Sequence, residues 1–298
     1  MSTNVPTNVT YSLEEFSRHG GLTGPHKDGW GIAYYSEGDV RLVKEPHPAS
    51  DSACVRFMQE YPFSSALVMS HIRKATQGAN TLTNCQPFVR ELGGAMHVFA
   101  HNGDFDNGRL RERLPLGFHR PVGETDSEYA FCALLGRLEE LWLRADGVPP
   151  LDRRTSIVAA FAEEIRDLGP GNFLYADGDA LFAHGHKRMH GEQGIRPPGL
   201  HVLCRRCAHD ARAAHINGGA HDARAADFGG LTIMPTTGEG ELHVVLIASV
   251  PLTRESEWRP LLEGELIVIR NGAIVGQPRG HHESVSAHRG AARSKHSL

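Results

Sequence analysis

The chain has 298 residues, of which 40% are hydrophobic and 22% charged, and its formal net charge at pH 7 is -4. Such a composition is typical of a globular protein, and the small negative charge excludes the basic surface that nucleic acids or anionic membranes attract. No apolar run approaches the roughly 18 residues of a membrane-spanning helix, and the start of the sequence does not have the layout of a signal peptide. We therefore expect a cytoplasmic protein that binds a small neutral or zwitterionic ligand.

Short apolar runs with the length of β-strands recur along the chain. Only a few residues separate several of them, which favours antiparallel pairing of neighbours. Asn271-Gly272 lies between two such runs and predicts a tight hairpin, because both central residues of a type I′ turn need a positive φ. The predicted strands are 30–35, 40–44, 66–71, 96–101, 172–177, 179–184, 200–204, 242–249 and 265–270.

Two longer helices are expected among these strands. The first follows a capping box at 125–128 and carries an apolar stripe from Phe131 to Trp142. The second is expected to begin near Thr155-Ser156 and to end at Gly169. A third, weaker helix is predicted for 52–61. Many strands and few helices indicate sheets that pack together and are covered by helices.

Two segments have no apolar periodicity. Residues 277–298 are expected to form a mobile tail, which leaves 1–276 as one domain. The stretch 204–230 contains the sequence AHDARAA twice, beginning at Ala208 and again at Ala220. A perfect short repeat without an apolar face is more typical of an inserted surface loop than of a core element.

Polar residues gather where two of the apolar runs end. Arg73 follows the run 66–71, and its guanidinium could clamp a substrate carboxylate, although a single loop arginine is more often a surface residue. Asn102-Gly103 follows the run 96–101, and an amide side chain beside a glycine N–H is the donor pair of an oxyanion hole, although Asn-Gly alone is usually a turn. Asp126 could accept a substrate ammonium or serve only as a helix-capping residue.

Four segments, taken in order, resemble the glutamine amidase domain of class II glutamine amidotransferases, a family of N-terminal-nucleophile hydrolases. These segments are HKDGWGIAYY (26–35), SHIRKATQG (70–78), FAHNGDF (99–105) and PVGETDSE (121–128). The resemblance runs from about Asn4 to about Gly276. It implies an α+β fold, a four-layer αββα sandwich of two antiparallel sheets, which agrees with the strand-rich pattern.

The resemblance also implies a reaction and a role for each site residue. Arg73 would bind the α-carboxylate of glutamine with Thr76 near it, and Asp126 would hold the α-ammonium. Asn102 and Gly103 would form the oxyanion hole. The implied reaction is hydrolysis of glutamine or of another γ-glutamyl amide, with the ammonia released outright or passed to an acceptor protein. No cofactor and no resident metal ion are expected.

In this family the nucleophile is a cysteine at the mature N-terminus, and its own α-amine serves as the base. An α-amine suits this task because its unperturbed pKa of about 7.7–8.0 lies near the operating pH. The bacterial branch that this chain resembles begins Met-Cys-x-Leu-Leu-Gly and continues Met-Ser-x-Asn-x-Pro, and Met1 matches the second methionine. We therefore expect that the start codon was placed too late. The alternative is a catalytically inactive glutamine-binding or regulatory protein.

A substitute nucleophile inside the chain is less favoured. Ser2, which removal of Met1 would expose, lies several residues past the matching position, and Cys85 has no obvious base. Five cysteines, an odd number, indicate free thiols. The CxxC motif at 204–207, with His209, His215 and His221 downstream, raises a zinc hypothesis, but a single CxxC is a weak signal.

Overall fold

The computed structural model describes residues 1–8, 16–24, 26–210, 226–227, 232–236, 239–253 and 256–278. Most strands in this part of the chain belong to one of two sheets. The larger sheet contains β1 (Ser2–Asn8), β2 (Trp30–Ser36), β3 (Asp39–Glu45), β4 (Ser64–Ile72), β11 (His201–Asp210), β12 (Ala226–Asp227), β13 (Thr232–Pro235), β14 (Glu239–Ala248) and β15 (Arg259–Pro260). The smaller sheet contains β5 (Phe88–Leu92), β6 (Ala95–Gly103), β7 (Gly171–Ala176), β8 (Leu181–Gly185), β16 (Glu265–Arg270) and β17 (Ala273–Gly276). A short ribbon is formed by β9 (Arg188–Met189) and β10 (Ile195–Arg196).

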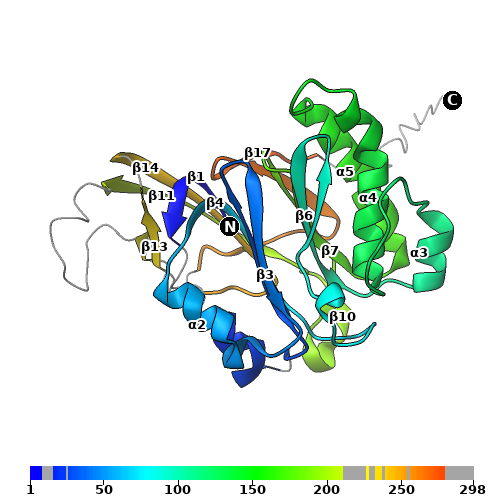
Figure 1. The fold of residues 1–298 in the computed structure, drawn as a ribbon, viewed down its shortest axis with the longest axis horizontal. Helices are drawn as coiled ribbons and strands as arrows, with labels where there is room; N and C mark the ends of the chain where they lie inside the picture. The colour runs from blue at the N-terminus through cyan, green and yellow to red at the C-terminus, as the bar shows by residue number, and fades with distance from the viewer. Residues whose placement is uncertain are drawn as a thin grey trace, which may run out of the picture.

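The two sheets lie face to face (Figure 1). The larger sheet has the order β15-β11-β14-β1-β4-β2-β3, with β13 also paired to β1, and the smaller has the order β17-β16-β8-β7-β6-β5. The helices are α2 (Ala53–Glu60), α3 (Asn107–Arg113), α4 (Asp126–Leu143) and α5 (Leu151–Ile165), with short helical turns at Arg18–Leu22, Ala49–Asp51, Leu82–Asn84, Arg166–Leu168 and Gly191–Gln193. Within the described ranges, no helix has both the length and the apolarity needed to cross a lipid bilayer.

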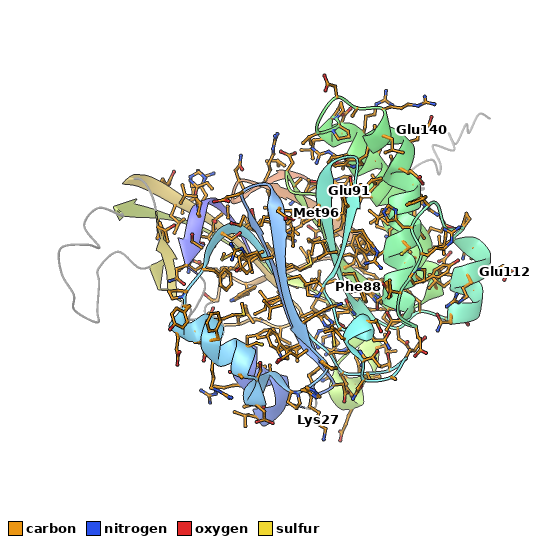
Figure 2. The ribbon with its side chains drawn as sticks, viewed as in Figure 1. Lys27, Phe88, Glu91, Met96, Glu112 and Glu140 are labelled. Atoms are coloured by element: carbon orange, nitrogen blue, oxygen red, sulfur yellow. The ribbon has the colours of Figure 1, made fainter. Side chains whose placement is uncertain are left out.

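Helices cover both sheets, which gives the four-layer αββα sandwich and confirms the predicted α+β fold class. On the smaller sheet, α4 packs Phe131 against Phe99 of β6, with the two ring centroids 5.2 Å apart. On the larger sheet, α2 packs through Val55 and Met58. Figure 2 shows side chains filling the space between these layers, whereas Glu112 and Glu140 project outward from the helical side.

The core between the sheets follows from alternation along the strands. On β6, Val98 and Ala100 belong to the buried cluster between the sheets, whereas Phe99 belongs to the cluster under the helices. Ile267 and Ile269 of β16 face the space between the sheets in the same way. Successive strand residues point to opposite faces, so an uninterrupted apolar run supplies two cores at once.

Each of the nine predicted runs forms a strand. The hairpin turn and the starts of the helices show which features a local sequence pattern predicts correctly. The hairpin turns at Asn271-Gly272, with φ of 50° and 67° as predicted. Thr125 Oγ1 accepts the N–H of Glu128 and starts α4. The expected start of α5 at Thr155 is wrong, since the helix begins at Leu151. Ser156 Oγ donates to the carbonyl of Asp152 inside the helix and caps nothing.

The repeat-containing segment lies only partly in the described residues. Cys204 to Asp210 belong to β11, which pairs with β14 along its whole length, and Ala226–Asp227 form β12. Residues 211–225 and the tail from 279 to 298 lie outside the described residues. An insertion at 204–230 and a mobile tail therefore stay predictions.

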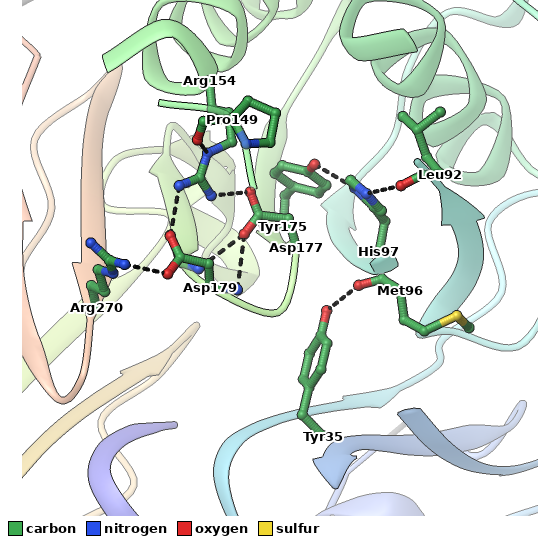
Figure 3. A network of polar contacts seen from close by, with 11 residues as sticks. Tyr35, Leu92, Met96, His97, Pro149, Arg154, Tyr175, Asp177, Asp179 and Arg270 are labelled. Carbon is green, nitrogen blue, oxygen red and sulfur yellow. Dashed lines mark hydrogen bonds and ion pairs between the residues drawn. The ribbon is translucent and has the colours of Figure 1, made fainter. Parts of the chain in front are cut away.

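A buried ion-pair network joins the helical layer to the smaller sheet (Figure 3). Arg154 of α5 is 2% exposed and donates to Asp177 Oδ2 and Asp179 Oδ2, both at 2.6 Å. Its Nε donates to the carbonyl of Pro149 at 2.9 Å. Arg270 at the end of β16 pairs with the other oxygen of Asp179 at 2.6 Å. Burial raises the pKa of Asp177, and the charge of Arg154 opposes that shift.

Arg154→Ala is expected to lower the free energy of unfolding by about 3–5 kcal/mol, because it leaves the carboxylate of Asp177 buried without its partner. Urea unfolding followed by circular dichroism measures the loss. Arg270→Ala is the matched control, since Arg270 is half exposed and an exposed pair contributes at most about 1 kcal/mol. Equal losses of unfolding free energy in the two variants would show that burial does not increase the contribution of an ion pair to stability.

Candidate active site

The four segments that carry the family resemblance meet at one edge of the two sheets. Arg73 follows the end of β4, and its N–H donates to the carbonyl of Gly29 at 2.8 Å. The loop after β4 reaches the end of β6, where Gln77 Nε2 donates to the carbonyl of Phe105 at 3.0 Å. The N–H of Phe105 donates to Asp126 Oδ2 at 2.8 Å, which adds the start of α4. Hydrogen bonds thereby connect Gly29 before β2, the loop after β4, the segment after β6 and the start of α4.

Arg73 is buried, and chain acceptors occupy all four N–H groups of its two terminal nitrogens. Nη1 donates to the carbonyl of Asp28 at 3.3 Å and to Asn80 Oδ1 at 2.9 Å. Nη2 donates to the carbonyls of Gln77 and Gly78 at 2.8 and 3.0 Å. The guanidinium therefore shapes the loop after β4. A substrate carboxylate would have to use Nε or displace Asn80, the one acceptor that belongs to a side chain.

Thr76 lies in this loop and is exposed. Its hydroxyl is 3.5 Å from Asp104 Oδ1, and Gln77 Nε2 donates to the same oxygen at 2.5 Å. Asp28 holds the loop from the other side, since its carboxylate accepts the N–H of Ala75 at 2.9 Å and the amide of Asn80 at 3.2 Å. Asp28 was not singled out from the sequence, although it lies in the segment at 26–35 that carries the resemblance.

Asn102 and Gly103 end β6 with donors that none of the described residues accepts. Asp104 N–H donates to Pro170 O at 3.2 Å on the β7 side, and His101 N–H donates to Gln86 Oε1 at 2.6 Å on the other side. Strand amides alternate in direction, so the Gly103 N–H points to the side of Gln86, where no described residue accepts it. The Asn102 side chain is exposed and has no hydrogen bond to the described residues.

The glycine at position 103 is required by close approach of the backbone. A Cβ at this position would lie 1.7 Å from Pro170 O and 2.7 Å from His101 Nε2. Any side chain there would push the end of β6 away from the segment that precedes β7. The arrangement leaves one side-chain amide and one backbone N–H next to each other in the chain, which is the donor set of an oxyanion hole.

Asp126 is 3% exposed and lies in the first turn of α4. One carboxylate oxygen accepts the N–H of Phe105, and the other is 3.4 Å from Ser127 Oγ. Asp126 thus holds the segment after β6, and its carboxylate can still accept a hydrogen bond from another donor. Thr125, and not Asp126, is the residue that caps the helix.

Two histidines pack behind these groups. Burial lowers the pKa of His71 to about 3, and its Nδ1 is enclosed without a hydrogen-bond partner among the described residues. Burial also lowers the pKa of His101, against the opposing charge of Asp126. His101 Nδ1 lies 2.9 Å from Ser127 Oγ, and its ring stacks on Phe105. Both rings are neutral at physiological pH. A neutral ring is better suited to orienting the site than to acting as a general acid.

The candidate nucleophiles within the chain make structural hydrogen bonds. Cys85 is fully buried, its thiol donates to the carbonyls of Glu45 and Thr81 at 3.3 and 3.4 Å, and burial raises its pKa. It is therefore a protonated structural thiol. Ser2 Oγ accepts the N–H of Gly272 in the β16–β17 turn at 3.2 Å. The α-amine of Met1 donates to the carbonyl of Val68 at 2.8 Å, and burial lowers its pKa to about 5.

The structure offers little support for a zinc site at the CxxC motif. Cys204 and Cys207 are three residues apart on β11, so their side chains leave opposite faces of the strand. The side chain of His209 and both His215 and His221 lie outside the described residues. Among the side chains that are described, no three from His, Cys, Asp and Glu are grouped so that they could hold a metal ion.

Two antiparallel sheets between helical layers form the αββα fold of the glutamine amidotransferases of the N-terminal-nucleophile type, as two solved structures show. The glutamine phosphoribosylpyrophosphate amidotransferase of Bacillus subtilis shares the fold at a TM-score of 0.51 and 13% identity, over 91% of this chain and 45% of that one. A predicted glutamine amidotransferase from Pseudomonas aeruginosa PA01, known from a crystal structure, matches at a TM-score of 0.61 and 30% identity, over 92% of this chain and 97% of that one.

Sequence comparison gives the family directly. Residues 1–293 match the family model described as "Glutamine amidotransferases class-II". The protein YafJ of Escherichia coli strain K12, whose name assigns it to the glutamine amidotransferases, is 35% identical over 265 residues, which cover 89% of this chain and 93% of that protein. This chain belongs to the class II glutamine amidotransferases.

Proposed function

We propose that this protein hydrolyses the side-chain amide of glutamine, or of another γ-glutamyl compound, by means of a cysteine nucleophile. One observation carries the proposal: β6 ends in the exposed amide of Asn102 and the uncovered N–H of Gly103, beside the buried carboxylate of Asp126. Donors that the described residues leave unused can bind an oxygen on which negative charge develops. The same edge offers a charged partner for the ammonium group of an amino acid.

The reaction needs two steps at one carbon atom. The thiolate adds to the amide carbonyl, and the two donors stabilise the tetrahedral oxyanion. The nitrogen takes a proton from the α-ammonium group that the nucleophile's own amine has formed, the C–N bond breaks, and ammonia leaves. Water then attacks the thioester, which releases the γ-carboxylate and regenerates the thiol. The ammonia either diffuses away or reaches an acceptor protein.

An open edge of β4 supports a nucleophile that precedes Met1. Met1 and Val68 exchange both backbone hydrogen bonds, at 2.8 and 3.0 Å. The N–H of Arg73 bonds to Gly29 on the β2 side, so by alternation the amides of Ser70 and Ile72 point to the opposite edge, where no described strand pairs with them. A chain that continued β1 backwards would lie along this edge, and its fifth residue before Met1 would lie opposite Arg73.

Substrate binding is expected to depend on Arg73 and Asp126. Arg73→Ala removes the cation for the α-carboxylate, and Asp126→Asn keeps an acceptor for the Phe105 N–H while it removes the charge. Each change should weaken glutamine binding at least about a hundredfold, because the loss of one partner from a buried charge pair costs about 3–5 kcal/mol. Isothermal calorimetry with glutamine measures the affinity.

Asn80→Ala is the matched control for this prediction. It removes a hydrogen bond of Arg73 from the same loop but frees an Nη1 donor for a carboxylate. We expect glutamine affinity to be unchanged or higher in this variant. Unchanged affinity in both Arg73→Ala and Asp126→Asn would refute the assignment of the pocket.

The alternative proposal is a glutamine-binding or regulatory protein without catalysis. It shares the pocket and its two charged residues, so binding experiments do not separate it from the amidase. Release of ammonia and glutamate does, since a binding protein returns intact glutamine.

A further inference from the structure

Asn172 is a fully buried amide whose bonds connect three segments next to the oxyanion donors. Its Nδ2 donates to the carbonyl of Asn102 at 2.9 Å and to the carbonyl of Lys187 at 2.8 Å. Its Oδ1 accepts the N–H of His186 at 2.7 Å. Both donors of the side chain and one of its acceptor positions are therefore used.

Close packing holds this side chain in one orientation. A Cβ at Gly199 would lie 1.6 Å from Asn172 Oδ1, so the backbone at 199 lies directly against the amide. The amide is thus enclosed by the end of β6, by the segment after β8 and by the loop at 199. Rotation of the amide would turn its oxygen toward the carbonyls of Asn102 and Lys187 and its nitrogen toward the N–H of His186, which costs three hydrogen bonds in a buried place.

The bond to Asn102 acts on the oxyanion hole through one rigid group. The carbonyl of Asn102 and the N–H of Gly103 belong to the same planar peptide, in which C=O and N–H point in opposite directions. A donor that holds the carbonyl oxygen on the β7 side therefore directs the Gly103 N–H to the other side, where it is uncovered. The Asn172 side chain adds to the backbone ladder between β6 and β7 at the last pairs before β6 ends.

We propose that Asn172 is a positioning residue for the reaction: it holds the Asn102–Gly103 peptide so that the Gly103 N–H points at the developing oxyanion. This inference rests on the proposed amidase function. Asn172 touches neither substrate nor nucleophile, and its influence passes through the peptide plane.

The test compares Asn172→Ala and Asn172→Asp with Tyr175→Phe in a form of the protein that hydrolyses glutamine. Asn172→Asp keeps the shape but replaces the two N–H donors with an acceptor. Tyr175→Phe is the matched control, since it removes a buried hydrogen bond of 2.7 Å to His97 from the same strand. Both Asn172 variants should lower kcat at least about tenfold with KM nearly unchanged, because small misplacements of catalytic groups reduce rates steeply. Tyr175→Phe should leave kcat unchanged.

A second readout does not depend on turnover. In ¹⁵N-labelled protein, both Asn172 variants should shift the amide resonance of Gly103, and Tyr175→Phe should not. If the form that carries the cysteine segment ahead of Met1 hydrolyses no glutamine, the proposed function fails, and the Gly103 resonance still decides whether Asn172 positions the peptide. A kcat and a Gly103 resonance that stay unchanged in Asn172→Asp would overturn the inference, as would a loss of kcat equal to that of Tyr175→Phe. If Asn172→Ala does not fold, Asn172→Asp alone carries both measurements.

Discussion

A form of this protein that begins with a cysteine five residues before Met1 is expected to hydrolyse glutamine, whereas the 298-residue chain is not. The reason is register. The pair Met1–Val68 sets the alignment of β1 with β4, and continuing it places that cysteine opposite Arg73, at the start of the loop that contacts Asp104 and Phe105 after β6. The cysteine's own α-amine supplies a base with an unperturbed pKa of about 7.7–8.0.

The measurement is the release of ammonia and glutamate from glutamine by the two purified forms. The longer form carries Met-Cys-x-Leu-Leu-Gly ahead of Met1, and removal of its initiator methionine exposes the cysteine. Cysteine→Ala in the added segment is the control, since it keeps the strand and removes only the thiol. Activity of the 298-residue chain that survived Cys85→Ala would show that another residue attacks.

Asn102→Ala in the active form is expected to lower kcat by about 10²–10³, the usual effect of removing one oxyanion donor. KM should change little, because the proposed contacts of Arg73 and Asp126 are with the other end of the substrate. Stability should also change little, since the Asn102 side chain is exposed and makes no hydrogen bond to the described residues. Steady-state kinetics and urea unfolding measure both effects.

The outcome of this substitution separates two roles for Asn102. A rise in KM with unchanged kcat would mean that its amide binds the ground state and the transition state equally, which is not the role of an oxyanion donor. Wild-type kcat and KM would remove Asn102 from the site.

The sequence by itself determined the features that depend on near neighbours. All nine predicted apolar runs became strands, because alternation along a strand is a local property. The turn at Asn271-Gly272 and the cap at Thr125 follow from side-chain chemistry within four residues. The order of the four resemblance segments was enough to indicate the family and its αββα fold.

Other features depended on partners far away in the chain. β1 contains Pro6 and is otherwise polar except for Val5, so no local pattern predicts it. It is a strand because β4 and β14 pair with it on either side, with a register shift between Ser2 and Thr7. The start of α5 was misjudged because Ser156 has a hydroxyl that can cap a helix or bond within one, and the sequence does not show which.

Tertiary structure alone decided how the site residues are used. Arg73 was expected to offer free donors, but three oxygens of the loop after β4 and the carbonyl of Asp28 occupy its terminal N–H groups. Gly103 is needed because Pro170 O lies against it, and Asn172 reaches the carbonyl of a residue 70 positions earlier. Contacts of this kind form only when packing brings distant strands together, and the desolvation of buried polar groups then requires each one to find a partner.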